Sequence, residues 1–264
     1  MAAEELESPM DGLYRIVAEA YRVFGGSPSR MGGIETCECC VNEETTKELN
    51  ATPLREITRW QVASYEQSAY QTTEDRRYMM PRILELFTQG EDPFCYSFGQ
   101  FLKWDAEGGD WHSWSRGEKS LLLDFANACF DLIFDCPMNP LPFSCGQITE
   151  VLLALDMDPI ARINTRFALG DPCQVFGVSM LYRVEEERAI SLDCMNLYPE
   201  CEKQLTDIFY SDTAVDILTN AIEAADNVII IEGLQYFRSL AKLHSEPHWV
   251  ESKLKEPDWL QMWG

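Results

Sequence analysis

The stretch TEDRRYMMPRILELFTQ, residues 73–89, decides the fold, and Gly90 closes it. Thr72 and Thr73 are both suited to capping a helix that starts here, and the two acids that follow suit its positive first turn. Apolar side chains then recur every three or four residues, which gives the helix one buried face. Pro81 removes one backbone hydrogen bond and predicts a kink. We therefore expect a helix over 73–89 at the centre of the fold.

Three arginines, Arg76, Arg77 and Arg82, lie in this helix, although the chain has only 21 basic residues. The planar guanidinium group matches a carboxylate and suits partly buried ion pairs between helices. Acidic residues are plentiful on the neighbouring segments. We expect the three arginines to have a structural role and to tie this helix to the helices around it.

Helical patterns also fill the sequence on both sides of this stretch. They are bounded by cap residues, glycines and prolines, and no alternation of period two supports a sheet. In 227–243 the opening Val-Ile-Ile-Ile run would also suit a strand, but the later apolar positions favour a helix. In 58–70 we expect Trp60 and the other apolar residues to face inward. The sequence therefore predicts an all-α fold, with further helices at 9–24, 58–70, 94–102, 116–136, 146–155, 159–169, 170–183, 198–210, 212–225 and 227–243. Residues 37–50 begin with a cysteine cluster and become a short polar helix.

Short links between the helices favour a single all-helical domain over residues 1–264. The helices would form a multi-helix array, and an irregular α-solenoid of antiparallel pairs would use the same elements. No fixed repeat period distinguishes these two arrangements. The tail 244–264 carries Trp249, Trp259 and Trp263. We expect this tail to dock on the helices, because it would otherwise expose a large apolar surface.

The charge balance is the strongest global signal, with 44 acidic against 21 basic residues and a formal net charge of -23. Such a chain is poorly suited to nucleic acid or to an anionic membrane surface, since both require positive charge. No apolar run has the roughly 20 residues that a membrane helix requires. The acidic N-terminus lacks the basic and apolar regions of a signal peptide. The ten cysteines are scattered and do not form a disulfide framework. We expect a cytoplasmic location.

Cys37, Cys39 and Cys40 form the densest group of cysteines. Cys37 and Cys40 have the spacing of one half of a zinc site, but a structural zinc site needs a second pair of ligands. The sequence offers only His244 and His248 for that purpose. Adjacent cysteines also rarely form a comfortable disulfide. We expect a structural role for the three cysteines, with no bound metal and no cofactor.

The sequence predicts no catalytic residue. His112 follows Asp110 and could act as a general base, but no nucleophile motif accompanies it. Asp156 and Asp158 are explained by a turn and a helix cap. Glycine motifs of nucleotide-binding loops are absent from the sequence.

A loop rich in acids and tryptophans is the best candidate for binding a partner. Tryptophan buries a large area at low entropic cost, and neighbouring acids steer a basic protein towards it. We therefore expect the partner to be a protein with a basic surface, such as a toxin or effector. The predicted partner-binding residues are Trp104, Asp105, Glu107, Asp110, Trp111 and Trp114.

The motifs Cys37-x-Cys-Cys-Val41 and Asp75-Arg-Arg-Tyr-Met-Met-Pro-Arg-Ile-Leu-Glu-Leu86 resemble a group of uncharacterised bacterial helical proteins. The resemblance covers roughly residues 37–90, with similar helix spacing beyond. In general character the chain is similar to small acidic cytoplasmic immunity proteins. That similarity implies a non-catalytic protein that neutralises a bacterial toxin. Two alternatives stay open. The first is a hydrolase or metal-dependent enzyme whose site is built from dispersed acids, Cys and His. The second is a helical scaffold or adaptor.

Overall fold

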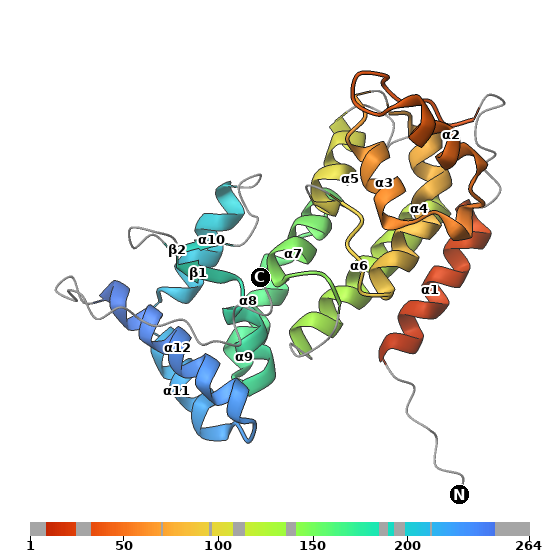
Figure 1. Cartoon of the computed structure of the whole chain (residues 1–264). Coiled ribbons are helices and arrows are strands. Elements are labelled where there is room, and N and C mark those ends of the chain that lie inside the picture. Colours follow the sequence, from red (N-terminus) through yellow and green to blue (C-terminus); the bar gives the residue numbers. More distant parts are fainter. Residues whose placement is uncertain are drawn as a thin grey trace, which may run out of the picture. The chain divides into compact units, whose positions relative to one another are not determined.

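The computed structural model describes residues 9–24, 33–69, 71–94, 97–107, 114–135, 141–184, 190–192, 199–211 and 213–245. These residues form an all-α fold, as the sequence predicts, and its helices are shown in Figure 1. The elements are α1 (Pro9–Phe24), α2 (Glu43–Ala51), the 3-10 helix η1 (Leu54–Glu56), α3 (Arg59–Glu66), α4 (Thr73–Thr88), α5 (Phe98–Glu107), α6 (Arg116–Asp135), α7 (Cys145–Ala154), α8 (Ile160–Leu169), α9 (Pro172–Ser179), β1 (Tyr182–Val184), β2 (Ile190–Leu192), α10 (Pro199–Phe209), α11 (Ala214–Ala224) and α12 (Val228–Ser245).

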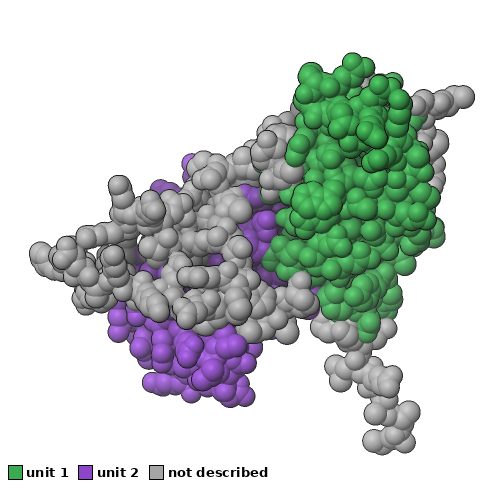
Figure 2. All heavy atoms as spheres, viewed as in Figure 1, with its two compact units in different colours: residues 1–129, 140–143 green, residues 130–139, 144–264 purple. Residues whose placement is uncertain are grey.

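The chain divides into two compact units, which Figure 2 colours separately. Unit 1 comprises residues 1–129 and 140–143, and unit 2 comprises residues 130–139 and 144–264. The sequence predicts that the chain acts as a single domain, and this stays a prediction. The α-solenoid arrangement of the helices also stays a prediction. The part of the predicted tail beyond residue 245 lies outside the described residues. Among the helices that the structure describes, none has the length and apolar character needed to cross a membrane.

Helix α4 is the central helix of unit 1, and α1 and α3 both pack against it (Figure 1). The Thr72 side chain accepts a hydrogen bond from the backbone N–H of Asp75 and caps the helix. At the other end Gly90 has a φ of 80°, the left-handed conformation that suits glycine after a helix. The helix continues through Pro81, which is buried. The opening stretch of the sequence therefore forms the core helix that its pattern predicts.

Arg77 and Arg82 of α4 contact carboxylates. The Arg77 Nε donates to Glu118 of α6 over 2.9 Å, and Arg82 Nη1 lies 2.6 Å from Glu85 of the next turn. Arg76 donates to the Gln71 amide oxygen at 2.7 Å and to the Phe101 carbonyl at 3.3 Å. These contacts join α4 to α5 and α6.

An aromatic cluster fills the core of unit 1 beside α4. The Phe87 ring lies 5.1 Å from the Phe98 ring and 4.2 Å from the Phe143 ring, measured between centroids. Phe94 stacks on Phe98 at 5.5 Å. Phe143 belongs to the short segment 140–143 that returns to unit 1 after residues 130–139 have joined unit 2.

Unit 2 is built around α9, which contacts α8, α11 and α12, while α11 and α12 lie side by side (Figure 1). Asp171 caps α9 and Pro172 occupies its first turn, a position where the missing N–H costs little. Gly177 of α9 lies directly against the backbone of Phe134, and the Cys145 thiol of α7 donates to the Gly177 carbonyl. Helices α7, α9 and the last turns of α6 therefore meet closely at this glycine.

Several of the predicted element boundaries are wrong, and the helix expected at 58–70, for example, ends at Glu66. The helix expected at 94–102 begins at Phe98 and continues to Glu107, so the start of the predicted acidic loop is helical. The helix expected at 170–183 ends at Ser179, and Tyr182–Val184 pairs with Ile190–Leu192 as an antiparallel hairpin. With three residues in each strand, the alternation of the hairpin is too short to stand out from the helical pattern.

Candidate functional site

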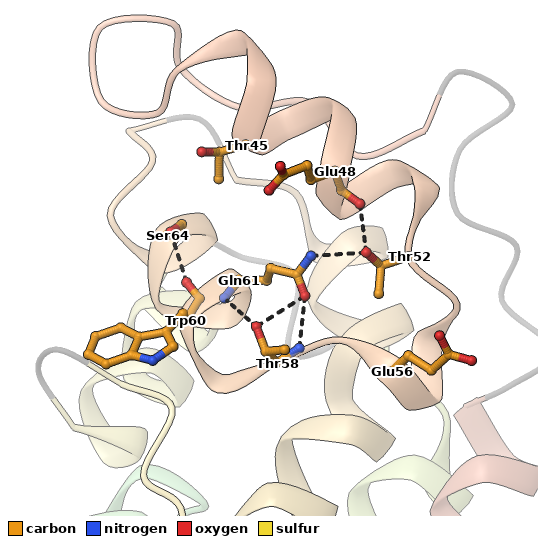
Figure 3. Close-up of a pocket in the computed structure, with 8 residues that line it drawn as sticks. All are labelled: Thr45, Glu48, Thr52, Glu56, Thr58, Trp60, Gln61 and Ser64. Carbon is orange, nitrogen blue, oxygen red and sulfur yellow. Dashed lines mark hydrogen bonds between the residues drawn. The ribbon is translucent and has the colours of Figure 1, made fainter.

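A polar groove of about 490 Å³ lies between α2, η1 and α3 of unit 1 (Figure 3). Figure 3 shows Gln61 in the middle of the groove, with Thr45 and Glu48 on the α2 side. The lining has two carboxylates and no histidine, cysteine or basic side chain. The lining residues are Thr45, Glu48, Thr52, Glu56, Thr58, Trp60, Gln61 and Ser64.

Hydrogen bonds fix the floor of this groove. The Gln61 amide oxygen accepts from the backbone N–H of Thr58 at 2.9 Å, and the Gln61 amide nitrogen donates to the Thr52 hydroxyl at 2.9 Å. The Thr52 hydroxyl in turn donates to the Glu48 carbonyl at 2.7 Å. Thr58 and Gln61 also form the capping box of α3. The same side chain therefore starts α3 and ties it to the end of α2, which holds the groove in shape before any ligand binds.

The groove carries one large exposed ring, that of Trp60, whose side chain is 69% exposed. Glu48 and Glu56 line the same groove and are exposed, and the Arg59 guanidinium lies 4.5 Å from the Trp60 ring centroid. The expectation that Trp60 faces inward is wrong. Its position is about 200° around the helix from buried Val62, because each residue turns an α-helix by about 100°. Helical periodicity, applied strictly, would have placed Trp60 on the exposed face.

The residues predicted to bind a partner are only partly described. Trp104, Asp105 and Glu107 lie in α5, but their side chains are outside the description, and Asp110 and Trp111 fall outside the described residues altogether.

Trp114 is the one member of the predicted partner-binding group whose side chain is described. It is 3% exposed and packs edge-on against Phe24, with 5.7 Å between the ring centroids. Trp114 is therefore part of the core of unit 1 and is not an exposed anchor.

Cys37, Cys39 and Cys40 lie on a tight turn that precedes α2. The Cys37 carbonyl accepts from the backbone N–H groups of Cys40 and Val41, both at 2.9 Å. The three thiol sulfurs all lie within 4.8 Å of one another, and those of Cys37 and Cys39 are 2.9 Å apart. Cys39 and Cys40 are exposed and Cys37 is half-buried. The turn therefore gathers three accessible sulfur atoms at one point of unit 1.

Both sides of this turn are anchored. The Cys37 backbone N–H donates to the Ser68 hydroxyl, which follows α3, over 2.7 Å. The Asn50 side chain of α2 accepts from the Ile34 N–H at 2.6 Å and donates to the Ile34 carbonyl at 2.8 Å. Ile34 and Val41, on either side of the cysteines, are buried. The position of the thiols is thus set by the packing of the segment that carries them.

The pKa values of Cys37 and Cys39 are shifted in opposite directions. Hydrogen bonding with the Cys39 thiol, together with the Cys39 backbone N–H and the Cys40 thiol, lowers the pKa of Cys37 to about 7. The hydrogen bond with Cys37 and the negative charge that develops there raise the pKa of Cys39. Cys37 is therefore the first of the two to become a thiolate as the pH rises.

We expect iodoacetamide to alkylate Cys37 progressively faster between about pH 6 and pH 8, because only the thiolate reacts. Cys201 in α10 is the matched control, since burial, followed by the charges of Asp158 and Glu200, raises its pKa. Peptide mass spectrometry over a pH series measures both rates, each normalised to its value in alkaline buffer. Identical normalised profiles for the two cysteines would contradict the shift.

No protein family, curated protein or solved structure matches this chain. The resemblance to bacterial helical proteins and to immunity proteins therefore stays a hypothesis that rests on the motifs quoted above. The geometry itself offers two distinct features of unit 1, which are the polar groove beside Trp60 and the turn with three thiols.

Proposed function

We propose that this chain is a non-catalytic cytoplasmic protein that binds a protein with a basic surface, and that this partner is a bacterial toxin which it neutralises. The observation that carries the proposal is the exposure of Trp60. This residue is 69% exposed and lines a groove whose lining includes two carboxylates and no basic side chain. An exposed tryptophan at a hydrogen-bonded groove is a typical anchor for a protein partner.

The charge of the chain supports a basic partner. The formal net charge of -23 gives a long-range attraction for cations, and Glu48 and Glu56 place negative charge at the groove itself. Such charges mainly raise the rate of association. The desolvated ring then lowers the rate of dissociation.

The groove and the predicted loop can serve the same partner. Trp104, Asp105, Glu107, Asp110 and Trp111 repeat the combination of rings and acids that the groove shows around Trp60. In the proposal these residues stay candidates for partner contact, as the sequence predicts, and Trp60 supplies the anchor.

Co-expression with a toxin that is encoded beside this gene tests the function. We expect the chain to restore growth of cells that produce the toxin and to form a complex that weakens as salt is added, because salt screens the exposed charges. Failure to restore growth, with both proteins present in soluble form, would refute the neutralising role.

Replacing the exposed ring tests the binding surface. We expect Trp60→Ala to weaken the complex by about 30-fold, which corresponds to roughly 2 kcal/mol for a central aromatic anchor. The stability of the free protein should stay the same, because the ring is largely exposed. Calorimetric titration against the partner measures the affinity.

Tyr14→Ala is the matched control for this variant. Tyr14 is an exposed aromatic residue of unit 1, 51% exposed, that lies on α1 and does not line the groove. We expect its affinity to stay at the wild-type value. Equal affinities for the Trp60→Ala and wild-type proteins would remove the groove from the interface.

A further inference from the structure

Two of the three cysteines of the turn, Cys39 and Cys40, are exposed and Cys37 is half-buried, whereas cysteine is among the most buried residue types. Cys129 and Cys145 of this chain follow that rule, with 0% and 5% exposure, and behave as small apolar side chains. Cys39 and Cys40 are exposed and contribute nothing to the core. Core packing therefore does not explain why three cysteines are placed here.

The spacing of the sulfurs fits a single metal ion. Three thiolates on one ion, each at about 2.3 Å, lie about 4 Å from one another. The observed separations, all within 4.8 Å, reach that arrangement through small side-chain rotations on a turn whose backbone is already formed. No histidine, aspartate or glutamate joins the group among the residues that the structure describes.

We propose that Cys37, Cys39 and Cys40 bind one monovalent copper ion through their three sulfur atoms. Thiolates are soft ligands, and they select Cu(I) or Zn(II) among the biological metals. A structural zinc site almost always has four ligands, whereas Cu(I) is satisfied by three thiolates. The number of sulfurs available at the turn therefore favours copper. This site is independent of the toxin-binding groove.

The sequence alone predicts no metal here because a zinc site would need a second pair of ligands. A site with three thiolates needs no such pair. Glu35 and Glu38 are exposed within the same short segment and add negative charge that attracts a cation.

Titration of the full-length, reduced protein with Cu(I) under argon, against bicinchoninate as a competing chelator, tests the site. We expect one copper ion to bind, and Cys37→Ser, Cys39→Ser and Cys40→Ser each to weaken binding by about 100-fold or more. Loss of an outer partner of a metal ligand already costs 10- to 100-fold. X-ray absorption of the loaded protein should show a coordination shell of three sulfurs.

Cys201→Ser is the matched control, because Cys201 is a partly exposed cysteine of α10 in unit 2. It should keep the wild-type copper affinity. Far-UV circular dichroism tests whether the serine variants fold. We expect the Cys39 and Cys40 variants to fold, because both side chains are exposed.

Three results would overturn the site. The first is wild-type copper affinity in the three serine variants. The second is a zinc ion that binds at the same cysteines and is not displaced by Cu(I). The third is a disulfide among these cysteines that persists in phosphine reductant and blocks binding.

Discussion

Glu118→Ala is expected to lower the free energy of unfolding by about 3 kcal/mol, the cost of removing one partner of a buried ion pair. The Glu118 side chain is 3% exposed and the Arg77 side chain is 27% exposed, so the arginine would keep a charge that water reaches poorly. Glu118 also caps α6, because its carboxylate accepts from the Ser115 N–H at 2.7 Å while the Ser115 hydroxyl accepts from the Glu118 N–H. One substitution would remove both interactions.

Glu118→Gln separates these two roles. The amide oxygen of glutamine can still accept from the Ser115 N–H, but it offers no negative charge to Arg77. We expect a loss of about 1–2 kcal/mol, smaller than that of the alanine variant. Urea denaturation followed by circular dichroism measures both values.

Asp124→Ala is the control on the same helix. Asp124 is an exposed acid of α6, and its removal should change stability by no more than about 0.5 kcal/mol. If Glu118→Ala were no more destabilising than Asp124→Ala, the ion pair between α4 and α6 would not support the fold.

Gly177→Ala is expected to destabilise unit 2 by about 1–3 kcal/mol, because an added Cβ would lie 2.9 Å from the Phe134 carbonyl oxygen and 3.1 Å from its Cα. Both atoms belong to the backbone of α6 and cannot rotate away as a side chain can. Alanine favours a helix over glycine by about 1 kcal/mol, so the clash must exceed this gain. Gly177→Val adds two further methyl groups and should cost more.

Gly12→Ala is a control for which we expect the opposite change in stability. Gly12 lies in α1, and an added Cβ would meet nothing within 4 Å. We expect this variant to be more stable by about 0.5–1 kcal/mol, since the unfolded chain loses conformational freedom. Urea denaturation compares the two alanine variants, and equal shifts in the same direction would contradict the close approach at Gly177.

The local signals of the sequence predict the helices well. Thr72 caps α4 and Gly90 ends it, each through side-chain or backbone chemistry that acts within a few residues. The ambiguous run at 227–243 forms α12, because its later apolar positions follow the helical period. Such features need no knowledge of the rest of the fold.

The candidate sites depend on contacts between segments, which the sequence pattern does not contain. The groove is created by Gln61 reaching from α3 to Thr52, and Trp114 is buried because α1 brings Phe24 to it. The grouping of three cysteines is visible in the sequence, but their exposure depends on how Ile34 and Val41 are packed. Tertiary packing therefore decides which of the candidate binding side chains are accessible to a partner.

The interleaved order of the two units affects how the protein is made. Unit 1 needs Phe143 to complete the contact with Phe87, yet residues 130–139, which belong to unit 2, leave the ribosome first. At about 5–20 residues per second, the 14 residues from 130 to 143 take roughly one to three seconds to synthesise. During this interval the nascent chain holds an apolar cluster that lacks one of its rings, and this is the stage at which a chaperone would have most to recognise.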